Sequence, residues 1–288
     1  TILTQVVLKV PIKDLITKLI ERTFMDKQLR ILSLGAGVQS STLALMIEYG
    51  EVPMVDCAIF ADTGDEPKEV YKWLDYLKGK LSYPVYMVNN GNLKEDSLKS
   101  NFLKIPVFTK NTVTEEIGFG RRQCTREYKI FPIQRKVREL LGLKKYQRVP
   151  KDTKVEMLIG ISKDEMSRIA RSRDWWIDNQ YPLVLEKQFS RIDCYNWLKN
   201  NNHPIPDKSA CTYCPFNSNT SWLRHKKDPE EWEKLVKFDK EIRNKIRYKD
   251  VEAYLHKDCV PLDEVELDPH KDQMDMFNDI CDEGMCGV

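Results

Sequence analysis

Short runs of apolar residues alternate along the chain with segments whose apolar positions follow a helical spacing. The runs of strand length are residues 29–34, 54–60, 84–88 and 155–161. Helices are predicted between the first three of them, over 41–48 and 66–77. Strands that alternate with helices are typical of a mostly parallel sheet with helices on both faces. The pattern therefore predicts an α/β fold of the Rossmann-like kind.

The two ends of the chain differ from this α/β part. Residues 1–24 carry apolar side chains at helical spacing after Pro11, which predicts an amphipathic helix or an extension. Residues 203–288 hold five of the eight cysteines and a helix signal at Asp228, a good N-cap residue. We therefore expect an α/β domain over 25–202, followed by a small, cysteine-rich, helical C-terminal subdomain with a tail.

The composition limits the classes to which the protein can belong. With 288 residues, 41% hydrophobic and 31% charged, the chain resembles an ordinary globular enzyme. The net charge is only +2, so any site for a polyanion must come from local clustering. No run approaches the roughly 20 apolar residues of a membrane span, and the first residues lack the apolar core of a signal peptide. We expect a cytoplasmic protein without a membrane partner, whose cysteines bind metal or react rather than form disulfides.

Small residues form the turn after the first predicted strand. Glycines let backbone N–H groups approach an anion, and the following helix N-terminus adds partial positive charge. The sequence is not a Walker A loop, and Ser40 stands in the place of the third glycine of a dinucleotide fingerprint. We expect phosphate or sulfate here; a plain tight turn, and a dinucleotide site with Asp62 on a ribose, are the alternatives. The residues concerned are Ser33, Gly35, Gly37, Gln39, Ser40 and Ser41.

Basic residues surround Cys124. They are Arg121, Arg122, Arg126, Lys129, Arg135, Lys136 and Arg138. Guanidinium groups bind phosphate and sulfate with two hydrogen bonds, and nearby cations favour a thiolate. We expect Arg121, Arg122 and Lys129 to contact an anionic ligand and the last three to lie on a solvated helix face. A second basic cluster, Arg168, Arg171 and Arg173, precedes Trp175 and Trp176. Basic residues beside aromatic ones can bind a nucleic-acid strand, but tryptophans are more often part of a core.

Cys211 and Cys214 are the sharpest local signal near the C-terminus, because two thiolates this close can bind one metal ion. Cys124 would add a third ligand if the fold brings it close. A fourth would come from Cys259, Cys281 or Cys286. Soft thiolates also suit zinc, and free thiols are the third interpretation.

Residues 37–40, Gly-Val-Gln-Ser after a serine-containing strand, resemble the modified PP-loop of phosphoadenosine phosphosulfate (PAPS) reductases. The wider PP-loop family, the N-type ATP pyrophosphatases, has Asp where this chain has Gln39, and Gln is similar to the reductase branch. Further likenesses follow in the order of that family over residues 28–220. They are Asp62-Thr63-Gly64, Glu69-Val70-Tyr71, Cys124 with Lys129 and Pro132, Gly160-Ile161-Ser162 with Arg168, and Pro182-Leu183.

The resemblance implies an adenine nucleotide alpha-hydrolase-like fold and a site for ATP, adenosine phosphosulfate (APS) or PAPS. The residues it assigns to the nucleotide, besides the first turn, are Asp62, Thr63, Gly64, Arg121, Arg122, Gly160 and Arg168. It also implies a [4Fe–4S] cluster on Cys124, Cys211 and Cys214, with Cys286 as a further ligand. The ending Glu283-Gly284-Met285-Cys286-Gly287-Val288 is similar to the reductases' Glu-Cys-Gly tail, whose cysteine attacks sulfur and is released by a partner thiol. Cys286, Cys124 and Lys129 are therefore the candidate catalytic residues.

Three hypotheses on function follow. The first is a sulfonucleotide reductase-like enzyme that uses a thiol reductant, and Gln39 favours it. The second is an ATP-dependent sulfurtransferase that adenylates and thiolates a tRNA or DNA target with a sulfur donor protein; Cys124, Cys211 and Cys214 favour it. The third is a non-catalytic module with structural zinc that binds nucleotide or nucleic acid, which the near-neutral charge disfavours. The resemblance also implies a homodimer.

Overall fold

The structure, a computed structural model, describes residues 28–270 and contains a five-stranded parallel sheet. The order of the strands is β3-β2-β1-β6-β7, and each neighbouring pair is parallel. The strands are β1 (Leu29–Leu34), β2 (Cys57–Asp62), β3 (Val85–Asn89), β6 (Val155–Ile159) and β7 (Ile177–Gln180). The predicted α/β fold with a Rossmann-like parallel sheet is confirmed.

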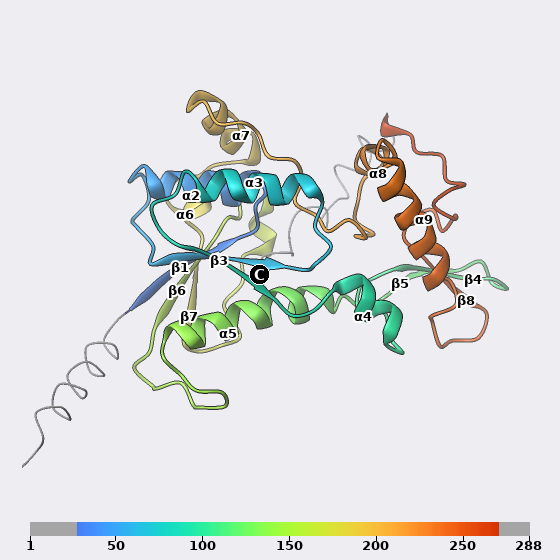
Figure 1. The fold of residues 1–288 in the computed structure, drawn as a ribbon, viewed down its shortest axis with the longest axis horizontal. Coiled ribbons are helices and arrows are strands. Elements are labelled where there is room, and N and C mark those ends of the chain that lie inside the picture. The colour runs from blue at the N-terminus through green and yellow to red at the C-terminus, as the bar shows by residue number, and fades with distance from the viewer. Residues whose placement is uncertain (1–27, 271–288) are drawn as a thin grey trace, which may run out of the picture.

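Helices cover both faces of this sheet (Figure 1). On one face lie α2 (Val38–Glu48), α3 (Lys68–Lys78), α6 (Pro182–Leu185) and α7 (Arg191–Asn200). On the other face the π-helix η1 (Thr125–Ile130) continues into α5 (Phe131–Leu140). Strand β1 shows why two layers are needed, since Leu32 packs into one core and Ile31 into the other.

A second part of the molecule is built around a three-stranded antiparallel sheet in the order β5-β4-β8. Its strands are β4 (Phe108–Asn111), β5 (Ile117–Phe119) and β8 (Val251–Tyr254). Its helices are α4 (Leu93–Lys99), α8 (Asn219–Lys226) and α9 (Pro229–Ile242). They share one hydrophobic core, in which Trp222 and Phe238 are fully buried.

The wholly helical character predicted for the C-terminal subdomain is corrected by this second sheet. The helix predicted at Asp228 is present as α9, and the Asp228 side chain accepts from the N–H groups of Glu230 and Glu231. Strand β8, however, pairs with β4 from the middle of the chain. The C-terminal residues therefore complete a core with α4, β4 and β5, because β8 alone has no partner strand near it in sequence.

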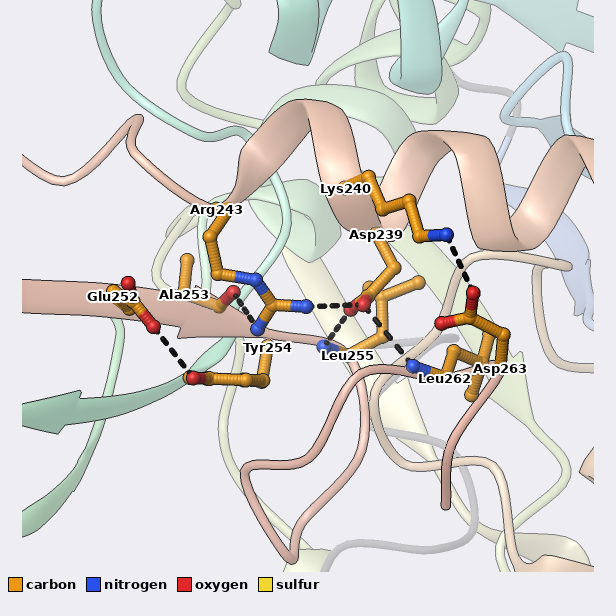
Figure 2. Close-up of polar contacts among 9 residues, drawn as sticks. All are labelled: Asp239, Lys240, Arg243, Glu252, Ala253, Tyr254, Leu255, Leu262 and Asp263. Carbon is orange, nitrogen blue, oxygen red and sulfur yellow. Dashed lines mark hydrogen bonds and ion pairs between the residues drawn. The ribbon is translucent and has the colours of Figure 1, made fainter.

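A buried carboxylate ties α9 to the segment that follows it (Figure 2). Asp239 is fully buried and accepts hydrogen bonds from the backbone N–H groups of Leu255, at 2.8 Å, and Leu262, at 3.2 Å. Arg243 pairs with Asp239 at 2.5 Å and donates to the carbonyl of Ala253 at 2.9 Å. Burial raises the pKa of Asp239, while these hydrogen bonds and Arg243 oppose the rise.

Two short helical segments complete the elements, η2 (Lys163–Arg168) after β6 and η1 before α5. Among residues 28–270 no helix has the length and apolarity to cross a membrane. The predictions for residues 1–24, Cys281 and Cys286 lie outside the described residues, and the predicted domain boundaries stay predictions.

Candidate functional site

The first turn of the site lies between β1 and α2. Helix α2 begins at Val38, and its N-cap is Gly37, which has no side chain to cap the first backbone N–H groups. The first turn of α2 carries no acidic residue. Ala36 has a positive φ of 56°, so the turn holds a conformation that residues with a side chain rarely adopt. An uncapped helix N-terminus at the carboxyl end of a central strand attracts an anion.

Two glycines allow other segments to approach this turn closely. A Cβ added at Gly160, just after β6, would lie 2.5 Å from the Cα of Ser40. A Cβ added at Gly37 would lie 2.8 Å from the Oγ of Ser209. The Nε2 of Gln39 donates to the Oγ of Ser162 at 3.3 Å. The structure therefore brings the end of β6 and the segment before Cys211 against the predicted anion-binding turn.

The three serines of the turn differ in what their hydroxyls do. Ser33 and Ser40 are buried at the margin of the turn, and the Oγ of Ser40 makes a long contact of 3.3 Å to the carbonyl of Gly37. Ser41 is fully buried, and its Oγ accepts from the Nε1 of Trp73 at 2.8 Å. The Ser41 hydroxyl thus bonds within the core, whereas the Ser40 hydroxyl bonds within the turn.

The second turn follows β2. Asp62 accepts hydrogen bonds from the N–H of Gly64 and from the Tyr71 hydroxyl, both at 2.8 Å. Gly64 has a φ of 77°, the left-handed region that glycine adopts without strain. The pKa of Tyr71 is raised by burial and then by the Asp62 carboxylate. In this structure Asp62 therefore organises the turn.

Three buried polar side chains beside the second turn contact one another, and one of them, Glu66, was not predicted from the sequence. The Thr63 hydroxyl donates to the Oε1 of Glu66 at 3.0 Å, and the Nζ of Lys129 lies 3.8 Å from the same oxygen. The side chains of Glu66 and Lys129 are only 2% and 11% exposed. Lys129 comes from η1, so the pair joins the predicted catalytic lysine to the second turn. The only signal for Glu66 was an acidic residue close behind Asp62-Thr63-Gly64, which is also typical of an ordinary helix start.

The predicted arginines divide among three places. Arg168 pairs with the Oε1 of Glu165 at 2.6 Å, and burial raises the pKa of Glu165. Arg121 is exposed beside η1. The guanidinium of Arg122 lies 5.2 Å from the centroid of the Phe216 ring, close to the cysteine pair. Each arginine thus has different surroundings, and their assignment to a nucleotide stays a prediction.

Cys211 and Cys214 form a turn beside the site. The N–H of Thr212, between them, donates to the carbonyl of Asp65 at 2.8 Å, which fixes the pair to the second turn. A hydrogen bond with Cys211 lowers the pKa of Cys214 against the opposing effect of burial, and a backbone hydrogen bond from Phe216 and the charges of Arg122 and Lys208 lower it further. Cys124 packs against the hydrophobic cluster that contains both cysteines.

These cysteines do not complete a metal site within the described residues. Between residues 28 and 270 no group of three or more Cys, His, Asp or Glu side chains is arranged to hold a metal ion. Cys259 is buried, and its Sγ lies 3.9 Å from the carbonyl of Thr109 on β4. The predicted cluster and zinc sites, which also call on Cys281 or Cys286 outside the described residues, therefore stay predictions.

Comparison with known proteins gives similarity among the solved structures. No family model matches the chain, and no curated protein matches it. The chain is similar to the crystal structure of phosphoadenylyl-sulfate (PAPS) reductase from Candida auris in complex with phosphate, at 14% sequence identity and a TM-score of 0.42. The similarity covers 70% of this chain and 91% of that chain.

Proposed function

We propose that this protein is an enzyme of the sulfonucleotide reductase kind, which binds an adenine sulfonucleotide such as PAPS or APS and reduces it with thiols. The observation that carries the proposal is the uncapped N-terminus of α2 with the Cys211–Cys214 turn packed beside it. The helix N-terminus attracts an anionic sulfate or phosphate group, and the cysteine turn places reactive thiols near that group. The motifs of residues 28–220 resemble the same class of enzyme.

In this proposal the ligand's anionic group binds at the first turn. Backbone N–H groups of α2 and the Ser40 hydroxyl donate to it. Lys129, which pairs with Glu66 beside the second turn, supplies a positive charge. A largely buried ion pair keeps the ammonium group in one place, which an exposed lysine would not do.

The reaction we propose has two steps. A cysteine thiolate attacks the sulfur of the sulfuryl group, the sulfur–oxygen bond to the nucleotide's phosphate breaks, and the electron pair leaves with AMP or adenosine 3′,5′-bisphosphate. A thiolate of the reductant then attacks the cysteine Sγ of the resulting S-sulfocysteine, the bond between the two sulfurs breaks, and sulfite leaves with its electron pair. Two thiols are oxidised to one disulfide while sulfate is reduced to sulfite. Cys124 is the candidate nucleophile within the described residues, and Cys286 is the candidate outside them.

A second candidate function is ATP-dependent thiolation of a tRNA or DNA target. The lowered pKa of Cys214 favours it, since a thiolate next to a nucleotide site can carry sulfur. A [4Fe–4S] cluster or zinc belongs to this hypothesis too. Because the described donors do not complete a metal site, we assign no step to either metal.

The test is turnover by the full chain with a dithiol reductant, with PAPS, APS and ATP supplied in turn. We expect sulfite and the matching desulfated nucleotide from PAPS or APS. ATP consumption with a thiolated oligonucleotide as the product, and no sulfite, would establish the second candidate in its place. No turnover of any of the three would leave the non-catalytic module.

Gly160→Ala tests the site itself. The new Cβ would collide with the backbone of Ser40, so we expect nucleotide affinity to fall by tenfold or more and stability by about 1–3 kcal/mol. Gly79→Ala is the matched control, because its Cβ would meet only ordinary contacts, the nearest at 3.5 Å. Calorimetric titration with PAPS measures both variants, and equal affinities for the two would refute the placement of the site.

A further inference from the structure

The charge of this nearly neutral chain is strongly segregated. Residues 121–154 contain twelve Lys and Arg but three Asp and Glu, a net charge of +9. Since the whole chain carries +2, the rest of it carries −7. The segment comprises η1, α5 and the loop that leads from α5 to β6, seen in green below the sheet in Figure 1.

Nine cations of this segment lie outside the candidate nucleotide site, and six of them form what we call the basic strip: Arg126, Arg135, Arg138, Lys144, Lys145 and Arg148. All are exposed except Arg138, which is half-buried. The strip begins beside Lys129 and follows η1 and α5 to the loop. Residues 125–140 span roughly 24 Å at the rise of an α-helix, about seven nucleotide steps of a stacked strand.

Neutral groups are the hydrogen-bond partners of two of the strip's four arginines. Arg135 donates to the side-chain oxygen of Asn90 at 2.5 Å, and Arg138 donates to the backbone carbonyl of Gln147. Two of the segment's three acids pair with cations outside the strip, Glu127 with Lys104 at 3.0 Å and Glu139 with Lys136 at 2.6 Å. On the helical part of the strip, Arg135 and Arg138 are thus held in position without an acidic partner.

Two exposed aromatic rings accompany the cations. Phe131 is 40% exposed, and the guanidinium of Arg126 lies 5.1 Å from the centroid of its ring. Tyr146 is 87% exposed in the α5–β6 loop, with the Nζ of Lys145 5.1 Å from its ring centroid and a φ of 66°. Cations next to accessible rings match a ligand that offers phosphates and bases in alternation.

We propose that the basic strip binds a nucleic-acid strand and leads it along α5 toward the carboxyl edge of the sheet. The phosphodiester backbone contacts the row of arginines and lysines, and one base stacks on Tyr146. This binding does not depend on the reaction proposed above. RNA and DNA share the chemistry that the strip recognises, and the experiment distinguishes them.

The test measures fluorescence anisotropy of a labelled 20-nucleotide single strand, as RNA and as DNA, against the full chain over a series of salt concentrations. The loop variant is Lys144→Gln/Lys145→Gln/Arg148→Gln. We expect it to bind at least tenfold more weakly near 100 mM salt, with a salt slope shallower by about 2, since each lost contact to a single strand contributes about 0.7. The control variant Lys72→Gln/Lys199→Gln/Lys234→Gln removes three exposed cations from α3, α7 and α9 and should bind nearly as the parent does.

Tyr146→Ala separates stacking from charge. We expect affinity to fall about fivefold or more while the salt slope stays unchanged, because a ring contributes no counterion release. Turnover or binding of the free nucleotide should be unaltered in the loop variant, which keeps the two proposals apart. Equal losses in the loop and control variants would overturn the proposal. So would binding to phosphatidylserine vesicles with none to either oligonucleotide, which would assign the strip to a membrane surface.

Discussion

The two parts of the molecule are stabilised in different ways. The two cores that sandwich the parallel sheet consist mainly of aliphatic side chains, and β1, β2 and β6 contribute to both. The core of the second part contains Cys211 and Cys214, and the buried Asp239 lies within α9 beside it. Both parts depend on non-directional burial of apolar area, and the second also contains a fully buried carboxylate that hydrogen bonds and an ion pair hold in place.

This difference determines where chemistry can be placed. In the first part, the polar residues of the site lie in turns at the carboxyl ends of the strands, as in other open α/β sheets. In the second part, polar groups lie within the structural core itself. The candidate site lies where the two parts meet, with Thr212 bonded to Asp65 and Ser209 against Gly37.

The largest effect is expected at Asp239. Asp239→Ala removes the carboxylate that Arg243, Leu255 and Leu262 share, and leaves a largely buried guanidinium without its counter-charge. Breaking such a pair lowers the free energy of unfolding by about 3–5 kcal/mol. Chemical denaturation of the full chain measures it, with the second part expected to lose its structure first.

Lys240→Ala is the matched control on the same helix. Lys240 pairs with Asp263 at 2.5 Å, but its side chain is 58% exposed, so the loss should stay below about 1 kcal/mol. Figure 2 shows the two pairs side by side. Equal losses for the two variants would mean that the second part does not depend on its buried carboxylate.

The sequence was sufficient for most of the first part because its signals are local. The run at 29–34 is β1, and the helix predicted over 66–77 is α3 (Lys68–Lys78). Each is set by an apolar period and a turn residue within a few positions. Strand β7 escaped prediction, because three of its four residues, Asp178, Asn179 and Gln180, are polar at the edge of the sheet.

The second part and half of the site depend on contacts distant in sequence. Strand β8 is specified by β4, about 140 residues earlier, and Asp239 looks like a surface residue of a helix until its backbone donors are known. Glu66 becomes notable only when η1 brings Lys129 to it. The turn glycines could be predicted, since Gly37 and Gly160 stand next to strand ends. The close contacts that require a glycine, Ser209 against Gly37 and Ser40 against Gly160, could not be predicted from the local sequence pattern.

Substitutions of the neighbouring residues Ser40 and Ser41 test which of the two hydroxyls stabilises the core and which binds the nucleotide. Ser41→Ala leaves the Trp73 Nε1–H without its 2.8 Å acceptor, so we expect about 1–3 kcal/mol lower stability and unchanged nucleotide affinity. Ser40→Ala removes a hydroxyl at the ligand turn, so we expect unchanged stability and roughly fivefold weaker nucleotide binding, the equivalent of about 1 kcal/mol. Thermal unfolding and calorimetric titration with PAPS measure both variants. Weakened nucleotide binding in Ser41→Ala alone would reverse the assignment.

The smallest effect concerns the far end of the first part, where His203 joins three helices. Its Nε2 lies 2.9 Å from the hydroxyl of Tyr49, its Nδ1 lies 2.8 Å from that of Tyr76, and its ring stacks with Trp197. A neutral imidazole serves both tyrosines, donating to one hydroxyl and accepting from the other. Burial, and then the charge of Lys80, lowers the pKa of His203 below its ordinary value.

A lowered pKa in the folded protein means that the unfolded chain binds this proton more tightly. The contribution of His203 to stability is therefore complete above pH about 6.5 and is lost as the pH falls, by at most about 1.4 kcal/mol per pH unit. We expect His203→Gln to be less stable than the parent at pH 7.5 and to lose less of its stability between pH 7 and 5, measured by urea denaturation at each pH. His270→Gln, at an exposed position, should keep the parent's pH dependence. If His203→Gln retained the full loss at low pH, the acid sensitivity of the first part would originate elsewhere, and the contact among α2, α3 and α7 would hold with a charged imidazole as well as with a neutral one.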